Sequence, residues 1–294
     1  AHVLRPDSFN YYEAKFLYRK HRYIDAIKII ENVSIDQFPN NLRARSINLQ
    51  ANIYEKLGEN NAAFFKFSKM NKLVSEQKNF PALQSEHWLR NYTKLRSNLM
   101  GLQTLTSKKV PTEKYEPVFF IGFPRSGTTL VDTLLRSHSR ISVIEEKPCL
   151  NIAKASVFSV DDFSYLYLPE DADDFSRVRE RYYREQINYS GQSTEKIIID
   201  KLPLNLLETA FIRKAFPTSK IILGVRHPLD CVFSSWVQDF EINVAMAHFT
   251  NLKKSTDLYD LGMDIFFLVN KLLCLNNHIV RYENLVQDLE KEIK

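Results

Sequence analysis

Over the first third of the chain, apolar and polar residues alternate with the three- and four-residue spacing of helices. Two blocks with this spacing lie between residues 9 and 74, separated by a polar segment around Pro39. A third block covers residues 82–103 and contains Leu83, Trp88, Leu89, Tyr92, Leu95, Leu99 and Leu102. The pattern predicts paired helices over residues 9–74 and one longer helix over residues 82–103.

The first two blocks repeat one another. Ala14 and Ala51 are 37 residues apart, and so are Ala26 and Ala63, which is close to the ~34-residue period of tetratricopeptide (TPR) repeats. Alanine at these positions lets paired helices approach closely. We predict an all-α, TPR-like region with a bridging helix over residues 1–103, followed by a linker over residues 104–116.

From residue 117 the pattern changes to short apolar runs without alternation, separated by helix-like stretches. Runs of this kind are typical of parallel strands that are covered on both faces. They lie at Val118–Ile121, Ile141–Ile144, Ile197–Asp200, Lys220–Val225 and His278–Tyr282. The predicted fold class is therefore α/β, with a parallel sheet and flanking helices over residues 117–294.

The stretch over residues 117–130, PVFFIGFPRSGTTL, joins an apolar strand to a helix through a short polar loop. Phosphate-binding loops have this arrangement, because backbone N–H groups and a helix N-terminus then face one anion. Gly122 and Gly127 stand where the Walker pattern has glycines, but Thr128 stands where it has lysine. Because that lysine normally reaches the β- and γ-phosphates of a nucleoside triphosphate, this loop, with Arg125 on the approach, suits a different anion.

A second stretch over residues 221–236, IILGVRHPLDCVFSSW, is a strand-like run that ends at Arg226, with Ser234 eight residues later. Together, Pro124–Leu130 and this stretch resemble the 5′-phosphosulfate and 3′-phosphate motifs of sulfotransferases that use 3′-phosphoadenosine 5′-phosphosulfate (PAPS). The chain resembles most the branch with tyrosylprotein sulfotransferases and bacterial TPR sulfotransferases, over roughly residues 115–290.

The resemblance implies a P-loop-type, sulfotransferase-like domain with PAPS as co-substrate and 3′-phosphoadenosine 5′-phosphate (PAP) as product. It implies contacts to the donor from Arg125, Ser126, Gly127, Thr128, Thr129, Arg226 and Ser234. It also implies that Lys201, at the end of a strand, touches the leaving oxygen and the sulfonate. Since such enzymes usually continue beyond this point, we expect the domain over residues 117–294 to be incomplete at its C-terminal end.

The acceptor hydroxyl must lose a proton, and Glu146 is the predicted general base because its spacing from Arg125 matches that of tyrosylprotein sulfotransferases. A carboxylate desolvated in a cleft can titrate near working pH. His138 and His248 are the alternatives, because other sulfotransferases use histidine. Trp236 could wall the adenosine pocket or belong to the core. We expect no metal, because the reacting group carries less charge than a triphosphate.

Composition limits the partners and the compartment. The net charge of +5 is a mild excess of basic residues, which suits an anionic donor. It is weak evidence for nucleic-acid binding, because nucleic-acid-binding proteins usually have a concentrated basic face. The 3 cysteines form no Cys-x-x-Cys pair, and no apolar run reaches the ~20 residues that cross a bilayer. We expect a cytoplasmic protein without nucleic-acid or membrane partners.

Two alternatives to a sulfotransferase acting on an alcohol or phenol remain open. A P-loop kinase or nucleotide hydrolase would use Asp200 as a magnesium-binding aspartate at a strand end, but it lacks the loop lysine. A non-catalytic scaffold would use only the TPR-like helices. Those helices also indicate a peptide or protein partner, with peptide tyrosine as one candidate acceptor.

Overall fold

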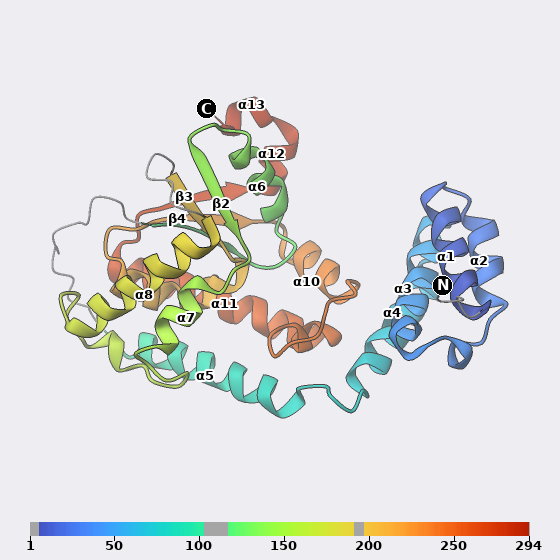
Figure 1. The fold of residues 1–294 in the computed structure, drawn as a ribbon, viewed down its shortest axis with the longest axis horizontal. Coiled ribbons are helices and arrows are strands. Elements are labelled where there is room, and N and C mark those ends of the chain that lie inside the picture. The colour runs from blue at the N-terminus through green and yellow to red at the C-terminus, as the bar shows by residue number, and fades with distance from the viewer. Residues whose placement is uncertain (1–5, 103–116, 191–196, 294) are drawn as a thin grey trace. The chain divides into compact units, whose positions relative to one another are not determined.

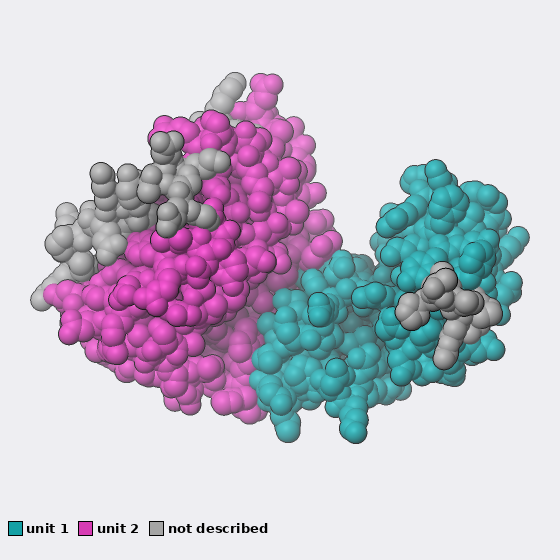
Figure 2. Space-filling view, viewed as in Figure 1, with its two compact units in different colours: residues 1–86, 233–255 teal, residues 87–232, 256–294 magenta. Residues whose placement is uncertain are grey.

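The computed structural model of the protein describes residues 6–102, 117–190 and 197–293 (Figure 1). The predicted linker over residues 104–116 lies outside the described residues. The chain forms two compact units, coloured separately in Figure 2. Unit 1 comprises residues 1–86 and 233–255, and unit 2 comprises residues 87–232 and 256–294. These units divide the chain differently from the predicted ranges, because residues 233–255 join the N-terminal helices.

Unit 1 is helical, as the spacing of its apolar residues predicts. Its helices are α1 (Pro6–Arg19), α2 (Tyr23–Glu31), η1 (Ile35–Gln37), α3 (Asn40–Lys56), α4 (Asn60–Ser75) and η4 (Met246–Thr250). Helices α1 and α2 pack together, as do α3 and α4. The four alanines that suggested a repeat are buried, at Ala14, Ala26, Ala51 and Ala63. The pairing fits a repeat of helical hairpins, and the TPR assignment stays a prediction.

The segment 233–255 completes the core of unit 1. Trp236 is buried against Ala51, Ala63 and Phe67, so it belongs to the core rather than to a nucleotide pocket. The side-chain amide of Asn71 donates a buried hydrogen bond of 2.8 Å to the carbonyl oxygen of Trp236. This return segment is therefore part of the hydrophobic core of the N-terminal helices.

Unit 2 contains a five-stranded parallel sheet with the order β2-β3-β1-β4-β5. The strands are β1 (Val118–Gly122), β2 (Ile141–Glu145), β3 (Ile197–Lys201), β4 (Lys220–Val225) and β5 (Asn277–Arg281). All five predicted runs are strands, and the predicted α/β class is confirmed. Tyr282, predicted as the last residue of its run, instead begins a helix.

Helices cover both faces of the sheet (Figure 1). They are α6 (Thr128–Arg136), α7 (Cys149–Ala155), η2 (Ser164–Leu166), α8 (Asp173–Ser190), η3 (Pro203–Glu208), α9 (Thr209–Ala215), α12 (Tyr282–Gln287) and α13 (Leu289–Ile293). Three further helices cross the boundaries of the units along the chain: α5 (Ala82–Met100), α10 (Pro228–Trp236) and α11 (Leu252–Leu273).

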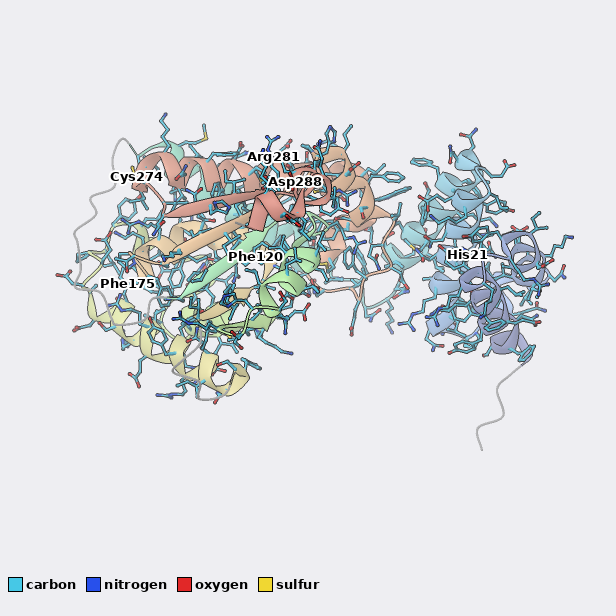
Figure 3. All side chains as sticks on the ribbon, turned by 90° about the horizontal axis from the view of Figure 1, so that it is seen from above. His21, Phe120, Phe175, Cys274, Arg281 and Asp288 are labelled. Atoms are coloured by element: carbon cyan, nitrogen blue, oxygen red, sulfur yellow. The ribbon has the colours of Figure 1, made fainter. Side chains whose placement is uncertain are left out.

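The central strand shows why these runs are apolar without alternation. Phe120, labelled in Figure 3, packs with Val131 of α6 and Leu285 of α12 on one face. Phe119 points to the other face, where its ring contacts Tyr182 of α8 and Phe216. Both phenylalanines are fully buried. Successive side chains of a strand point to opposite faces, so a sheet covered on both sides needs apolar residues at every position.

Candidate active site

The loop between β1 and α6 is held close to the sheet by two glycines. Gly122 and Gly224 are neighbours in register on β1 and β4. A Cβ atom at Gly122 would lie 2.6 Å from the carbonyl oxygen of Gly224 and 2.9 Å from the hydroxyl oxygen of Ser126. A side chain at position 122 would therefore push the loop away from the end of the sheet.

The backbone of the loop turns through two left-handed residues. Arg125 has φ +68° and Gly127, which precedes the first residue of α6, has φ +86°. Arg125 is exposed, whereas Ser126 and Thr128 are buried. Left-handed backbone is strained for arginine, and such strain is concentrated at functional sites because surrounding structure must maintain it.

The hydroxyl of Ser126 is a buried polar group that the described part of the chain leaves without a hydrogen-bond partner. Its side chain is 3% exposed, and its oxygen has no hydrogen-bond partner among the described residues. An unsatisfied buried hydroxyl costs about 1–3 kcal/mol. The loop thus combines backbone amides at the start of α6, a strained arginine and an unsatisfied hydroxyl.

At the ends of β2 and β3, one lysine contacts two carboxylates. Lys201 is fully buried, and its Nζ lies 3.1 Å from Oε1 of Glu145 and 2.9 Å from Oε1 of Glu146. The strand register pairs Glu145 with Lys201, and the backbone N–H of Glu146 donates to the carbonyl oxygen of Lys201 at 2.7 Å. The structure therefore brings together Lys201 and Glu146, which the sequence assigned to leaving-group stabilisation and to proton abstraction.

The two carboxylates differ in their other contacts. Glu145 also accepts a hydrogen bond from Arg136, which is held in turn by Asp132 at 2.6 Å. The hydrogen bond and charge of Lys201 lower the pKa of Glu145. Glu146 has φ +50° and its side chain is 58% exposed. Glu146 is thus more open to solvent than the desolvated base expected from the sequence.

Arg226 follows the end of β4 and lies over an aromatic ring. Its guanidinium carbon is 4.6 Å from the centroid of the Tyr282 ring, and its Nη2 is 3.1 Å from Oδ2 of Asp230. A Cβ atom at Gly127 would meet the same ring, 2.3 Å from its Cδ2 atom. Tyr282 therefore contacts both the loop after β1 and the arginine after β4.

The next residue fixes the turn after β4. The carboxylate of Glu283 accepts a hydrogen bond of 2.7 Å from the backbone N–H of His227. Ser234 lies further along α10, in the segment that belongs to unit 1, so its predicted contact with a phosphate bound at Arg226 stays a prediction.

A sequence model described as the Sulfotransferase family matches residues 117–294. The chain belongs to the sulfotransferase family. The resemblance carried by the two motifs is thereby confirmed at the level of the family.

Two individual proteins are similar to this chain. An uncharacterized protein of Aquifex aeolicus (strain VF5) is 24% identical over 227 residues, which cover 74% of the chain and 29% of that protein. The chain thus spans 29% of the length of this relative. The crystal structure of a sulfotransferase from Alicyclobacillus acidocaldarius matches with 16% identity and a TM-score of 0.38, covering 60% of this chain and 77% of that one.

The two histidines considered as alternative bases differ in exposure. His138 is exposed and lies beyond the C-terminal end of α6, where its Nδ1 accepts a hydrogen bond from the backbone N–H of Arg140 at 3.1 Å. His248 is buried in unit 1, and its Nε2 lies 2.8 Å from the hydroxyl of Ser85. Burial lowers the pKa of His248. Both contacts are structural, which leaves Glu146 as the better-placed candidate.

Asp200 lies next to Lys201 but points to the opposite side of β3. It is fully buried, and its Oδ2 accepts a hydrogen bond of 3.1 Å from the hydroxyl of Tyr182 on α8. Burial raises its pKa to about 7. A magnesium-binding aspartate must be charged and open to a ligand, so this environment argues against the kinase or hydrolase alternative.

The part of the chain that the structure describes contains no group of three or more His, Cys, Asp and Glu side chains arranged to hold a metal ion. Within the same residues, no helix is long and apolar enough to cross a membrane. The cysteines are all free: Cys149 and Cys231 are buried, and Cys274 is exposed.

Proposed function

We propose that the protein transfers a sulfuryl group from PAPS to the hydroxyl of an alcohol or phenol. The observation that carries this proposal is the left-handed loop Arg125–Gly127, which lies at a helix N-terminus, lacks the Walker lysine and shares the Tyr282 ring with Arg226. Family membership supports the reaction class.

In this proposal the two ends of the donor bind to different loops. Arg125, Ser126, Gly127, Thr128 and Thr129 hold the 5′-phosphosulfate through backbone amides, hydroxyls and the guanidinium. Arg226 and Ser234 hold the 3′-phosphate. The unsatisfied hydroxyl of Ser126 supports a polar ligand at this place, because a donor oxygen would supply the missing hydrogen bond.

The chemical step needs a base and a cation. Glu146 accepts the proton of the acceptor hydroxyl as the new O–S bond forms and the bond from sulfur to the phosphate oxygen breaks. Lys201 stabilises the charge that develops on the leaving oxygen, and Arg125 assists it. The Nζ atom of Lys201 lies 2.9 Å from Oε1 of Glu146. When both substrates are bound, Lys201 must therefore either leave Glu146 or contact Glu146 and the donor at the same time. The exposed position of Glu146 allows an acceptor to approach it.

The test is calorimetric binding of PAP in the absence of Mg²⁺. We expect micromolar binding that is lost in Arg226→Ala, because the 3′-phosphate then has no arginine partner. Arg184→Ala, which removes an exposed arginine paired with Glu180 on α8, is the matched control. Undetectable PAP binding combined with Mg²⁺-dependent binding of ATP would overturn the proposal in favour of a kinase or hydrolase.

A further inference from the structure

Unit 1 contains a groove of about 420 Å³ that the proposed reaction does not use. Its walls are α1, α3 and the segment 238–239, and all of its lining residues belong to unit 1. The lining includes Lys15 and Arg19 from α1, Arg45 and Asn52 from α3, and Asp239. A space of this size is much larger than a single small anion requires.

Side-chain amides of α3 fasten the segment that contributes Gln238 and Asp239 to the groove. The Nδ2 group of Asn48 donates to the carbonyl oxygen of Val237 at 2.9 Å, and the Nδ2 group of Asn52 donates to Oδ1 of Asn48 at 2.9 Å. This chain of bonds connects α3 to the segment that ends the groove. These hydrogen bonds hold the segment in place, so the groove is a defined part of unit 1.

The charge of the groove is positive. Three basic side chains line it, at Lys15, Arg19 and Arg45, against one acidic side chain, Asp239. Arg45 is 3.7 Å from Asp239 and partly neutralised by it. The ammonium of Lys15 lies over the Tyr11 ring, 5.7 Å from its centroid. Lys15 and Arg19, one turn apart on α1, thus leave an excess of positive charge along this wall of the groove.

The length of the groove fits a short extended segment. The lining positions on α1 run from Tyr11 to Arg19 and those on α3 from Arg45 to Asn52. At 1.5 Å per residue these stretches measure about 12 and 10 Å, which corresponds to about four residues of extended peptide. The phenols of Tyr11 and Tyr18 and the side chain of Leu49 add apolar contact surface between the charges.

We propose that this groove binds an extended acidic peptide segment, with carboxylates at Lys15 and Arg19 and apolar side chains between them. The argument is charge complementarity in a groove that is also lined by the phenols of Tyr11 and Tyr18. A nucleic acid is disfavoured, because the groove contains a carboxylate at Asp239 and only three cations. The inference is independent of the donor and of the reaction.

The experiment is fluorescence anisotropy with a fluorescein-labelled peptide, Glu-Leu-Glu-Phe-Glu-Glu, on the whole chain at low salt. We expect micromolar binding that is weakened at least about tenfold when glutamine replaces every glutamate, since the carboxylates supply most of the attraction. Binding should also weaken as salt rises. A ten-nucleotide oligothymidylate is the competing probe.

Two variants are expected to change peptide binding in opposite directions. Because misfolding can only weaken binding, a gain of binding in one of them cannot result from a loss of folded protein. Arg19→Glu should weaken peptide binding about tenfold or more, and Asp239→Asn should strengthen it about threefold, because it removes the like charge. Lys69→Glu, an exposed position on α4 outside the groove, is the control for net charge. Equal binding of the acidic and glutamine peptides, equal losses in Arg19→Glu and Lys69→Glu, or tighter binding of the oligonucleotide would each overturn the proposal.

Discussion

The Tyr282 ring lies against the guanidinium of Arg226, with 4.6 Å between the guanidinium carbon and the ring centroid. The same ring closes the space beside Gly127. Thus one aromatic side chain, directly after β5, contacts both of the segments proposed to bind the two phosphate groups of the donor. Cation–π contact with a partly buried arginine both attracts it and fixes its orientation.

We expect Tyr282→Leu to weaken PAP binding roughly fivefold, which corresponds to about 1 kcal/mol, because Arg226 loses the ring that orients it. Calorimetry without Mg²⁺ measures this change. Tyr282→Phe keeps the ring and should bind PAP within twofold of wild type. If the two substitutions weaken binding equally, the hydroxyl rather than the ring carries the effect, and the proposed role of the ring is wrong.

Gly127→Ala should destabilise unit 2 by about 2–4 kcal/mol, because alanine is strained at positive φ and its Cβ would overlap the Tyr282 ring. Urea denaturation of the purified chain measures the loss. The double variant Gly127→Ala with Tyr282→Ala removes the overlap but keeps the backbone strain. It should therefore lose less stability than the sum of the single variants, and strict additivity would contradict the contact.

Arg125 offers a test of strain at the loop. Replacing it with glycine relieves the left-handed backbone, whereas replacing it with alanine retains the strain. We expect Arg125→Gly to be about 0.5–1 kcal/mol more stable than Arg125→Ala in urea denaturation, although both lose donor binding. Where φ is negative, alanine is normally more stable than glycine. If Arg125→Ala proves more stable than Arg125→Gly, the backbone strain at residue 125 is absent.

Asp200 should make stability depend on pH. Burial raises its pKa from 3.8 to about 7, so the folded state resists ionisation that the unfolded chain undergoes. This contribution is fully present below pH ~4 and is lost as pH rises toward 7. Asp200→Asn should match the wild type at pH 4 and exceed it by up to about 4 kcal/mol at pH 8.

The measurement is the free energy of unfolding in urea between pH 4 and 8, for wild type and Asp200→Asn. Asp171→Asn, at an exposed position, controls for the loss of one charge. A difference between wild type and Asp200→Asn that stays constant over this range would show that Asp200 does not titrate there.

Substitutions of Glu145 and Glu146 should have different effects on kcat. Glu146→Gln should lower kcat at least about a hundredfold, as expected for loss of a general base, and leave PAP binding within threefold. Glu145→Gln should have a much smaller effect on kcat, since Glu145 is already engaged by both Lys201 and Arg136. If Glu145→Gln lowers kcat more than Glu146→Gln does, Glu145 rather than Glu146 is the general base.

The inner strands β1, β3 and β4 could be predicted because each contains a continuous apolar run, and a sheet covered on both faces imposes that pattern on its inner strands. The loop over residues 123–127 could also be predicted, because Gly122 before it and Gly127 at its end are needed locally. The positions of Arg125 and Glu146 in left-handed backbone could not be predicted, since arginine and glutamate carry no local signal for it.

Contacts between segments that are distant in the sequence could not be predicted either. The contact of Tyr282 with Gly127 and Arg226 depends on how three separate segments pack, and nothing near residue 282 encodes it. The bridge from Lys201 to Glu145 and Glu146 depends on the register of β2 and β3. The sequence placed Trp236 at a nucleotide pocket or in a core, and only the packing with Phe67 and Ala51 decides for the core.

The return of residues 233–255 to unit 1 has a consequence for synthesis of the chain on the ribosome. The N-terminal helices emerge first, but Trp236, and the His248 that pairs with Ser85, follow only after residues 87–232 have been made. At about 5–20 residues per second this interval lasts on the order of ten seconds. During it the nascent helices lack part of their core, so Phe67 and its neighbours remain accessible to chaperones until the later segment arrives.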